Sequence, residues 1–350
     1  MDKEKIISYI ENSFLSPILK INSVTDISFN GSSLFYVDND YGRKKSDINI
    51  SNEEVRDFLR QLANLTEKQF SYQDPFLDVS VGRYRINAVH QSIARKNNEN
   101  VLTFSLRIAS LCNKINNDKY FLNDKLKLFF KKIIDNNCSI VISGITGTGK
   151  TEFQKYLISL MKNYTRTIVI DNVQELETLY YENDLDLTYW LVDDKNINAS
   201  SHKLIKNALR SNPDWLIVAE SRGEEVSDVI TSAMTGHPII TTIHALDNYS
   251  VPTRMARLSL KGTQNENFNN VLEDILYHIH FYVYLKKEVH NQVINRYISS
   301  IMYRDNNGVN IELYSKKNEK ELYYNFDKKT LKSISFLNEN LIEGVFEYEK

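Results

Sequence analysis

The chain has 350 residues, 42% of them hydrophobic and 25% charged, which is enough for two or three ordinary globular domains. Its formal net charge of −2 gives no global sign of a nucleic-acid-binding protein. Two cysteines, Cys112 and Cys138, lie far apart without metal-ligand spacing, which predicts buried reduced thiols and argues against zinc. No apolar run could span a bilayer and the N-terminus does not resemble a signal peptide, so we expect a cytoplasmic protein.

Two helices are predicted in the first part of the chain. Residues 5–19 carry apolar side chains at near-helical spacing. Their polar face is mixed in sign, which favours a packed helix over a membrane-surface helix. Residues 52–65 also have a helical pattern, with Ser51 as the expected N-cap and Glu54 completing a capping box.

Strand-like alternation lies between and after these helices, and Asn30-Gly31 is a strong hairpin dipeptide. The alternating stretches are residues 24–50, 76–90 and 101–108. We therefore expect residues 1–112 to form an α+β domain with antiparallel strands, followed by a linker over residues 113–124.

Residues 139–151 read SIVISGITGTGKT and contain a full match to G-x-x-x-x-G-K-[ST]. The apolar residues 139–143 predict a strand buried on both faces, and residues 152–164 predict an amphipathic helix. This strand–loop–helix order is typical of a phosphate-binding loop, whose glycines let backbone N–H groups turn toward phosphate oxygens. Lys150 would bridge the β- and γ-phosphates, and Thr151 would offer its hydroxyl to Mg²⁺. We therefore predict a nucleotide-binding protein.

Acidic residues follow two further predicted strands. The strand at residues 166–171 ends in an acidic cluster that includes Asp171 and Glu175. Glu220 follows the strand at residues 215–219 directly, where its carboxylate could polarise a Mg²⁺-bound water. A surface carboxylate at a strand end is the alternative for Glu220. Because such strands deliver polar residues at their C-terminal ends, we expect this cluster near the nucleotide.

Two histidines bracket the next predicted strand, residues 238–243. His237 precedes it and His244 follows it, and either nucleotide sensing or ordinary packing is compatible with that position. We assign residues 125–290 to the nucleotide-binding domain and residues 291–350 to a strand-rich C-terminal appendage. The tyrosine-rich appendage either offers a partner surface or supplies ordinary core or edge strands.

The stretch NALRSNPDWLIVAESRGEEVSDVITSAMTGHPIITTIHA, residues 207–245, resembles the signature of the type II/type IV secretion traffic ATPases. Walker A, Asp-box, Walker B and His-box motifs occur in the family's order, at Gly144–Thr151, Asp171–Glu175, Leu216–Arg222 and Thr235–Ala245. VTDISFNGSSLFYV and RINAVHQSIA resemble stretches of the conjugation and tight-adherence branch, and the four-cysteine insertion of many type II secretion ATPases is absent from the sequence.

The resemblance implies catalytic roles for Lys150, Glu175 and Glu220. Glu175 matches the glutamate proposed to activate the attacking water, and Glu220 matches the Walker B glutamate. Thr151 would hold Mg²⁺, with Glu220 acting through a water. Asp171-Asn172 replaces the family's usual Glu-Asp pair, which could slow turnover, but Glu175 remains and we predict hydrolysis. Ala219 replaces the glycine before Glu220, and a strand tolerates that change.

The resemblance also implies a wider set of nucleotide-binding residues. Besides Lys150 and Thr151 these are Gly144, Thr146, Gly147, Thr148, Gly149, Arg85, Arg107, Arg222, His237 and His244. Arg85 and Arg107 match N-terminal-domain arginines that reach across to the nucleotide, where a cation offsets charge on the γ-phosphate. The alternative for either arginine is a solvent-exposed charge on a strand, with no contact to the nucleotide. Arg83 could also take the role given to Arg85.

The implied fold class is α/β, with the N-terminal α+β domain covering the nucleotide and a RecA-like P-loop NTPase domain built on a mostly parallel sheet. The implied function is a homo-hexameric ATPase, using ATP and Mg²⁺, that powers a bacterial type IV secretion, conjugation or tight-adherence-like pilus apparatus. It would associate peripherally with the cytoplasmic membrane through integral-membrane platform or channel proteins. A nucleic-acid translocase and an ATP-gated scaffold with little turnover are the alternatives. No basic stripe supports direct nucleic-acid contact, and we expect none.

Overall fold

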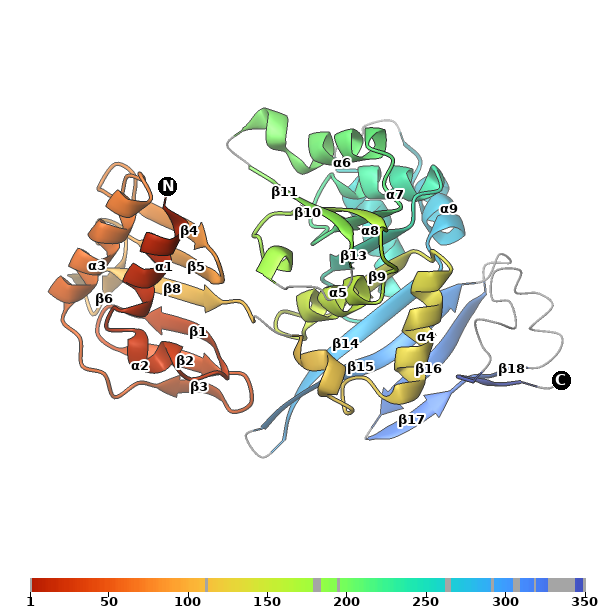
Figure 1. Cartoon of the computed structure of the whole chain (residues 1–350), viewed down its shortest axis with the longest axis horizontal. Helices are drawn as coiled ribbons and strands as arrows, with labels where there is room; N and C mark the ends of the chain where they lie inside the picture. The colour runs from red at the N-terminus through yellow and green to blue at the C-terminus, as the bar shows by residue number, and fades with distance from the viewer. Residues whose placement is uncertain are drawn as a thin grey trace. The chain divides into compact units, whose positions relative to one another are not determined.

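The computed structural model describes residues 2–110, 113–178, 184–193, 196–261, 266–290, 293–304, 309–317, 319–326 and 344–348 (Figure 1). The chain divides into two compact units. Unit 1 comprises residues 1–111 and 288–295, and unit 2 comprises residues 112–287 and 296–350. Among the described helices, none has the length and apolar character that crossing a membrane requires.

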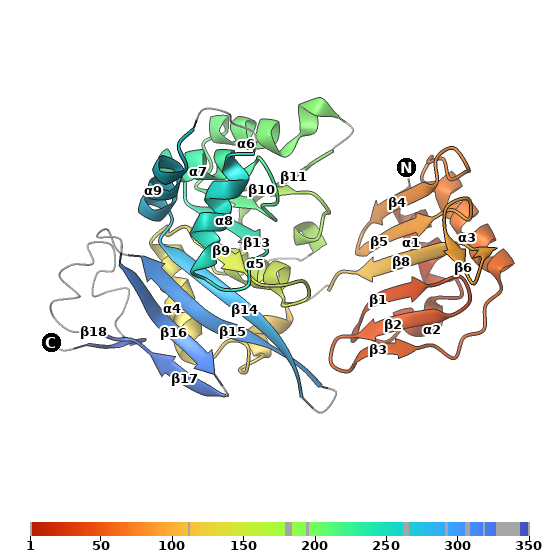
Figure 2. The same ribbon diagram turned by 180° about the vertical axis from the view of Figure 1, so that it is seen from behind.

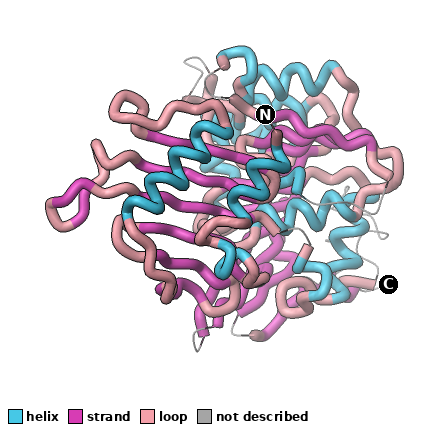
Figure 3. Tube along the Cα trace, turned by 60° about the vertical axis from the view of Figure 1, so that its left-hand side comes forward, coloured by secondary structure: helices cyan, strands magenta, loops and turns pink. Residues whose placement is uncertain are grey.

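Unit 1 contains a six-stranded antiparallel sheet with helices on one face (Figures 2 and 3). In sheet order the strands are β3 (Gly42–Lys45), β2 (Leu34–Asp38), β1 (Val24–Phe29), β8 (Thr103–Ile108), β5 (Tyr84–Val89) and β4 (Phe76–Val81). Alternate strand residues, such as Ile27, Ile86 and Leu106, are fully buried in one core with residues of the helices. The predicted α+β arrangement is confirmed, because period-two burial is what a sheet with one covered face requires.

The helices of unit 1 are α1 (Lys3–Glu11), α2 (Ser16–Leu19) and α3 (Asn52–Leu65), and a small hairpin, β6 (Arg95–Lys96) and β7 (Glu99–Asn100), precedes β8. Helix α3 has the predicted bounds, and Ser51 and Glu54 form the predicted capping box. The single helix predicted over residues 5–19 is instead two, with α2 starting at Ser16-Pro17. Pro17 has no N–H to continue an α-helical ladder but fits the first turn of a new helix.

Unit 2 contains most of a nine-stranded sheet, of which only residues 288–290 and 293–295 are counted with unit 1. In sheet order its strands are β11 (Asp186–Leu191), β10 (Arg166–Asp171), β12 (Trp215–Val218), β13 (Ile239–Ile243), β9 (Ile140–Ser143), β14 (Phe281–His290), β15 (Val293–Arg304), β16 (Asn310–Lys317) and β17 (Lys320–Tyr323). The pairings from β11 to β14 are parallel, and β15, β16 and β17 pair antiparallel. The predicted α/β class with a mostly parallel sheet is therefore confirmed.

Helices cover both faces of this sheet. They are α4 (Asp124–Asp135), α5 (Lys150–Ser159), α6 (Ser201–Arg210), α7 (Val226–Met234), α8 (Ser250–Ser259) and α9 (Phe268–His278). Ile140 and Ile142 of β9 lie in the core with α4 and α5, whereas Val141 lies in the core with α6 to α9. Strand β9 is thus buried on both faces, as its continuous apolar sequence indicates.

Short elements complete the described structure. They are the 3₁₀ turns η1 (Lys114–Asn117), η2 (Leu176–Thr178) and η3 (Ile197–Ala199), and the parallel pair β18 (Asn325–Phe326) and β19 (Glu347–Tyr348). Cys138 is buried, and burial raises its pKa to about 12, as suits an inert core thiol. Cys112 lies outside the described residues.

Strands β15 to β17 do not form a separate appendage. Strands β15 to β17 extend the sheet that carries the phosphate loop, and Ile298, Ile301 and Leu313 belong to the same core as α4. Strand β15 lies beside β14 and covers the edge that the parallel part of the sheet would otherwise leave open. Of the two interpretations of this region, ordinary core and edge strands is the one that the structure supports.

Candidate nucleotide site

The loop between β9 and α5 has the backbone geometry that its glycines predict. Gly144, Gly147 and Gly149 adopt φ angles of 150°, 79° and 94°, which residues with a Cβ rarely adopt. A Cβ on Gly144 would also lie 2.6 Å from the Leu285 carbonyl oxygen of β14. The backbone of β14 therefore leaves no space for a Cβ at the start of the loop, and glycine is required there.

Lys150 starts α5 and folds its side chain back into the loop. Its Nζ donates to the carbonyl oxygens of Gly144 at 2.9 Å and Ile145 at 3.2 Å, and the residue is only 9% exposed. The buried Thr148 hydroxyl donates to the same Ile145 carbonyl at 2.9 Å. Thr151, half-buried, follows in the first helical turn. The loop thus gathers a cation, a helix N-terminus and a hydroxyl, which is a fitting set for phosphate and Mg²⁺.

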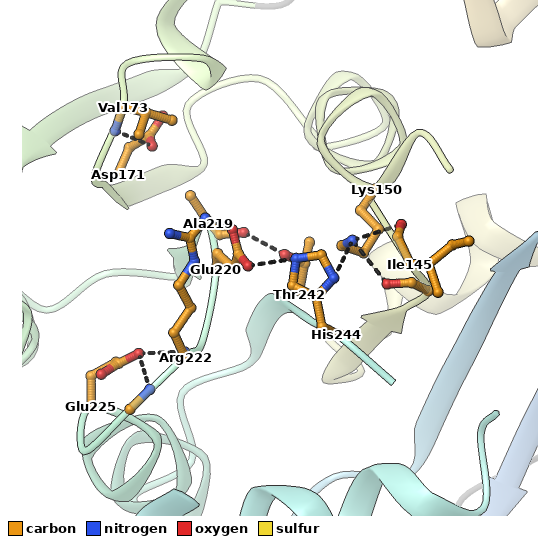
Figure 4. A network of polar contacts seen from close by, with 12 residues as sticks. Ile145, Lys150, Asp171, Val173, Ala219, Glu220, Arg222, Glu225, Thr242 and His244 are labelled. Carbon is orange, nitrogen blue, oxygen red and sulfur yellow. Dashed lines mark hydrogen bonds and ion pairs between the residues drawn. The ribbon is translucent and has the colours of Figure 1, made fainter. Parts of the chain in front are cut away.

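A line of polar contacts leads from the loop to the ends of β13 and β12 (Figure 4). Lys150 Nζ lies 3.5 Å from His244 Nδ1, and His244 Nε2 lies 2.9 Å from Glu220 Oε1. Arg222 donates to the other carboxylate oxygen of Glu220. Because β9, β12 and β13 are parallel neighbours or next neighbours, their carboxyl ends bring these residues to one edge of the sheet.

The charges along this line follow from the contacts. Burial lowers the pKa of His244 below 6.5, and the neighbouring Lys150 ammonium lowers it further, so the imidazole is neutral at pH 7. A neutral imidazole fits the Lys150 contact if Nδ1 accepts from the ammonium, which leaves the proton on Nε2, the nitrogen beside Glu220 Oε1. Burial raises the pKa of Glu220, but the hydrogen bond and charge of Arg222 outweigh it, so the net pKa lies below its ordinary 4.5. Glu220 is therefore an ionised carboxylate.

The segment after β10 is organised by Asp171. This side chain is 2% exposed, and its two oxygens accept from the backbone N–H groups of Val173 at 2.9 Å and Leu176 at 3.1 Å. The turn between them carries Glu175, which is half-buried and whose charge contributes to raising the pKa of Arg222. By accepting these two hydrogen bonds, the short Asp171 side chain holds the turn that carries Glu175, and Glu175 lies near enough to Arg222 for their charges to interact.

His237 does not join this site. It precedes β13 and pairs with the Thr235 hydroxyl at 3.2 Å, whereas His244 follows the strand. At about 3.3 Å per residue the two histidines lie on the order of 20 Å apart, at opposite ends of β13. The grouping of His237 with His244 at one nucleotide is therefore not supported within this chain, because a strand separates its flanking residues by its full length.

Arg85 and Arg107 lie opposite one another on β5 and β8 of unit 1, and Arg107 Nε is 3.8 Å from Asp26 Oδ1. Both stand on the sheet face that the helices leave uncovered. Arg83 instead stacks on the Tyr84 ring at 5.1 Å, in the turn before β5. Contact of Arg85 and Arg107 with nucleotide stays a prediction.

Sequence reasoning missed two residues beside the loop. Asn248, 1% exposed, donates to the Ser300 carbonyl and hydroxyl, and its side-chain oxygen accepts from the Ser143 hydroxyl. These hydrogen bonds connect β9 to β15. The one signal in the sequence is the position of this asparagine, four residues after His244. Arg296 donates to the Gly147 carbonyl at 2.8 Å, and nothing in its local sequence indicates that contact.

A profile of the type II/IV secretion system protein family matches residues 97–279, more than half of the chain. The chain belongs to this family. The matched residues include the phosphate loop, the Asp171–Glu175 turn and the line from Lys150 to Arg222, so the predicted traffic-ATPase superfamily is confirmed.

The chain spans 59% and 50% of the lengths of two relatives that it matches. An uncharacterised protein of Bacillus anthracis is 32% identical over 270 residues, which are 76% of this chain and 59% of that protein. Type IV secretion system protein VirB11 of Brucella suis is 30% identical over 185 residues, 51% of this chain and 50% of that protein. The X-ray structure of the Yersinia pseudotuberculosis ATPase DotB matches with a TM-score of 0.62 and 14% identity, covering 83% of this chain and 78% of that chain. This last likeness shows a shared fold.

Proposed function

We propose that this chain binds ATP at the phosphate loop and hydrolyses it to ADP and phosphate with Mg²⁺. The observation that carries the proposal is the unbroken line of contacts from Lys150 through His244 to Glu220 and Arg222. One end of the line holds the cation that phosphate loops place on the transferred phosphoryl group. The other end holds an ionised carboxylate of the kind that orients a metal or its water.

Each side chain contributes a separate part of this chemistry. Lys150 exchanges its two loop carbonyls for phosphate oxygens. Thr151 is the residue that would hold Mg²⁺, with Glu220 acting through a water. Mg²⁺, when bound, would supply Lewis-acid stabilisation of the phosphate charge. Glu175 acts as the base that orients the attacking water, and Arg222 keeps Glu220 ionised and fixed.

Phosphate release and binding of a fluorescent ATP analogue, measured for the wild type and Lys150→Ala, test this proposal. Loss of the loop cation should lower turnover by about 100-fold or more, the range found when one group that stabilises transition-state charge is removed. Lys162→Ala is the matched control, because Lys162 is an exposed lysine just beyond α5 with 67% of its side chain accessible. A wild-type rate no higher than that of Lys150→Ala would contradict hydrolysis and leave an ATP-gated scaffold.

We further propose that the ATPase works as a homo-hexamer on the cytoplasmic side of a type IV secretion, conjugation or tight-adherence-like pilus apparatus. Family membership and the likeness to VirB11 support a secretion setting, and the N-terminal sequence stretches support the conjugation or tight-adherence branch. Mass measurement with and without ATP should give a species near six subunits. A monomer under all nucleotide conditions would contradict the ring, and hydrolysis stimulated by DNA would favour a translocase instead.

A further inference from the structure

Two cations reach the phosphate loop from the strands that follow the matched family region. Arg296 of β15 donates from Nε to the Gly147 carbonyl oxygen at 2.8 Å. Lys287 of β14 lies beside the same residue, since a Cβ built on Gly147 would be 3.4 Å from its Nζ. Both side chains approach the loop independently of Lys150, whose ammonium contacts the Gly144 and Ile145 carbonyls.

The Arg296 contact fixes one peptide plane of the loop. The carbonyl of Gly147 and the N–H of Thr148 belong to the same planar trans peptide unit, so they point in opposite directions. Arg296 holds the carbonyl on its own side, which turns the Thr148 N–H to the other side of the loop. The structure gives this N–H no acceptor among the residues that it describes. An oriented backbone donor in a glycine-rich loop is a group that binds phosphate.

We propose that Arg296 is a positioning residue for nucleotide binding: its Nε–H holds the Gly147 carbonyl and so aims the Thr148 N–H at a nucleotide phosphate. The inference rests on the proposed ATP site and adds to it a residue outside the Walker, Asp-box and His-box motifs. Gly147, with φ 79°, has more backbone freedom than other residue types. A hydrogen bond from outside the loop can therefore hold its peptide group in one orientation.

Two substitutions separate the hydrogen bond from the charge. Arg296→Gln places an amide nitrogen at the same number of bonds from the backbone as Arg Nε, and so keeps a donor without the charge. Arg296→Met keeps an unbranched side chain of similar reach at that position but has no donor. Arg304→Met, on the same strand with its guanidinium on the Asn310 side chain at 3.1 Å, is the control for losing an arginine from β15.

The experiment measures the dissociation constants of fluorescent ADP and ATP for these variants, together with the thermal midpoint without nucleotide. Arg296→Met should bind both nucleotides about 5- to 10-fold more weakly, as expected for losing the support of one phosphate hydrogen bond. ADP and ATP should weaken by the same factor, because loop N–H groups cradle the α- and β-phosphates that both share. Arg296→Gln should stay within about threefold of the wild type, and Arg304→Met should match it.

Several results would overturn the inference while leaving ATP binding intact. Wild-type affinity in Arg296→Met would show that the contact positions nothing. Equal losses in the Gln and Met variants would show that charge acts, and not the donated hydrogen bond. A loss confined to ATP would place the effect at the γ-phosphate, away from the Thr148 N–H. Failure of the wild type itself to bind nucleotide would overturn the proposed function as well, so the two failures are distinguishable.

Discussion

Asn248 joins three parts of unit 2, and removing its amide should lower the stability of the chain. The side chain is 1% exposed and donates to the Ser300 carbonyl at 3.1 Å and the Ser300 hydroxyl at 2.9 Å, while its oxygen lies 3.3 Å from the Ser143 hydroxyl. Ser143 is the last residue of β9 before the phosphate loop, and Ser300 lies on β15. The contacts therefore link the segment after His244 to both strands.

The expected cost of Asn248→Ala follows from these contacts. Each hydrogen bond contributes a net ~1 kcal/mol, and the substitution removes three of them, so the free energy of unfolding should fall by about 3 kcal/mol. For a unit of this size that corresponds to a drop in Tm of about 6–12 °C.

Thermal and urea denaturation of the full chain measure this cost. Asn270→Ala, at an exposed site on α9, is the control and should change stability by less than about 0.5 kcal/mol. In a Ser300→Ala background the Asn248→Ala cost should shrink by about 1 kcal/mol or more, because the two residues share their bonds. A cost for Asn248→Ala below about 1 kcal/mol, or full additivity with Ser300→Ala, would refute the reasoning.

Two further predictions concern the loop and its histidine. ATPase activity should decrease on the acid side with a midpoint below pH 6.5, because burial and the Lys150 charge lower the pKa of His244. Protonation of Nδ1 removes the acceptor that faces Lys150. The residual activity of His244→Gln should lack that decrease, whereas a wild-type midpoint above pH 6.5 would contradict the assignment. Gly144→Ala should cost more stability than Gly236→Ala, measured by Tm. Both glycines have positive φ, but only at Gly144 would the new Cβ meet a backbone oxygen, at 2.6 Å. Equal drops in Tm would show that the Leu285 carbonyl can shift away from the new Cβ without loss of stability.

Local patterns predicted the parts of this protein that local chemistry determines. Strand β10 and helix α3 have the bounds read from sequence, since a capping box and a short apolar run between polar residues specify their own ends. The phosphate loop was predictable for the same reason, because its glycines encode an unusual backbone within eight residues.

Long-range pairing was not predictable in the same way. Strand β14 pairs with β9 across about 140 residues of sequence, and β15 then adds Arg296 to the loop. An apolar strand pattern shows that a strand forms but not which edge it joins. His237 and His244 are close in sequence, but β13 lies between them, and contact of His237 with nucleotide stays a prediction.

The most direct test of the account is the steady-state rate of phosphate release from Mg·ATP by the wild type, Glu220→Gln and Glu175→Gln, with Glu177→Gln as the matched control. Glu177 is an exposed carboxylate two residues beyond Glu175, on the same turn. Glu220→Gln and Glu175→Gln should each lose about 100-fold or more in rate while still binding ATP, and Glu177→Gln should keep the wild-type rate. Wild-type turnover in Glu220→Gln would contradict the central claim that the line from Lys150 to Arg222 is the catalytic site.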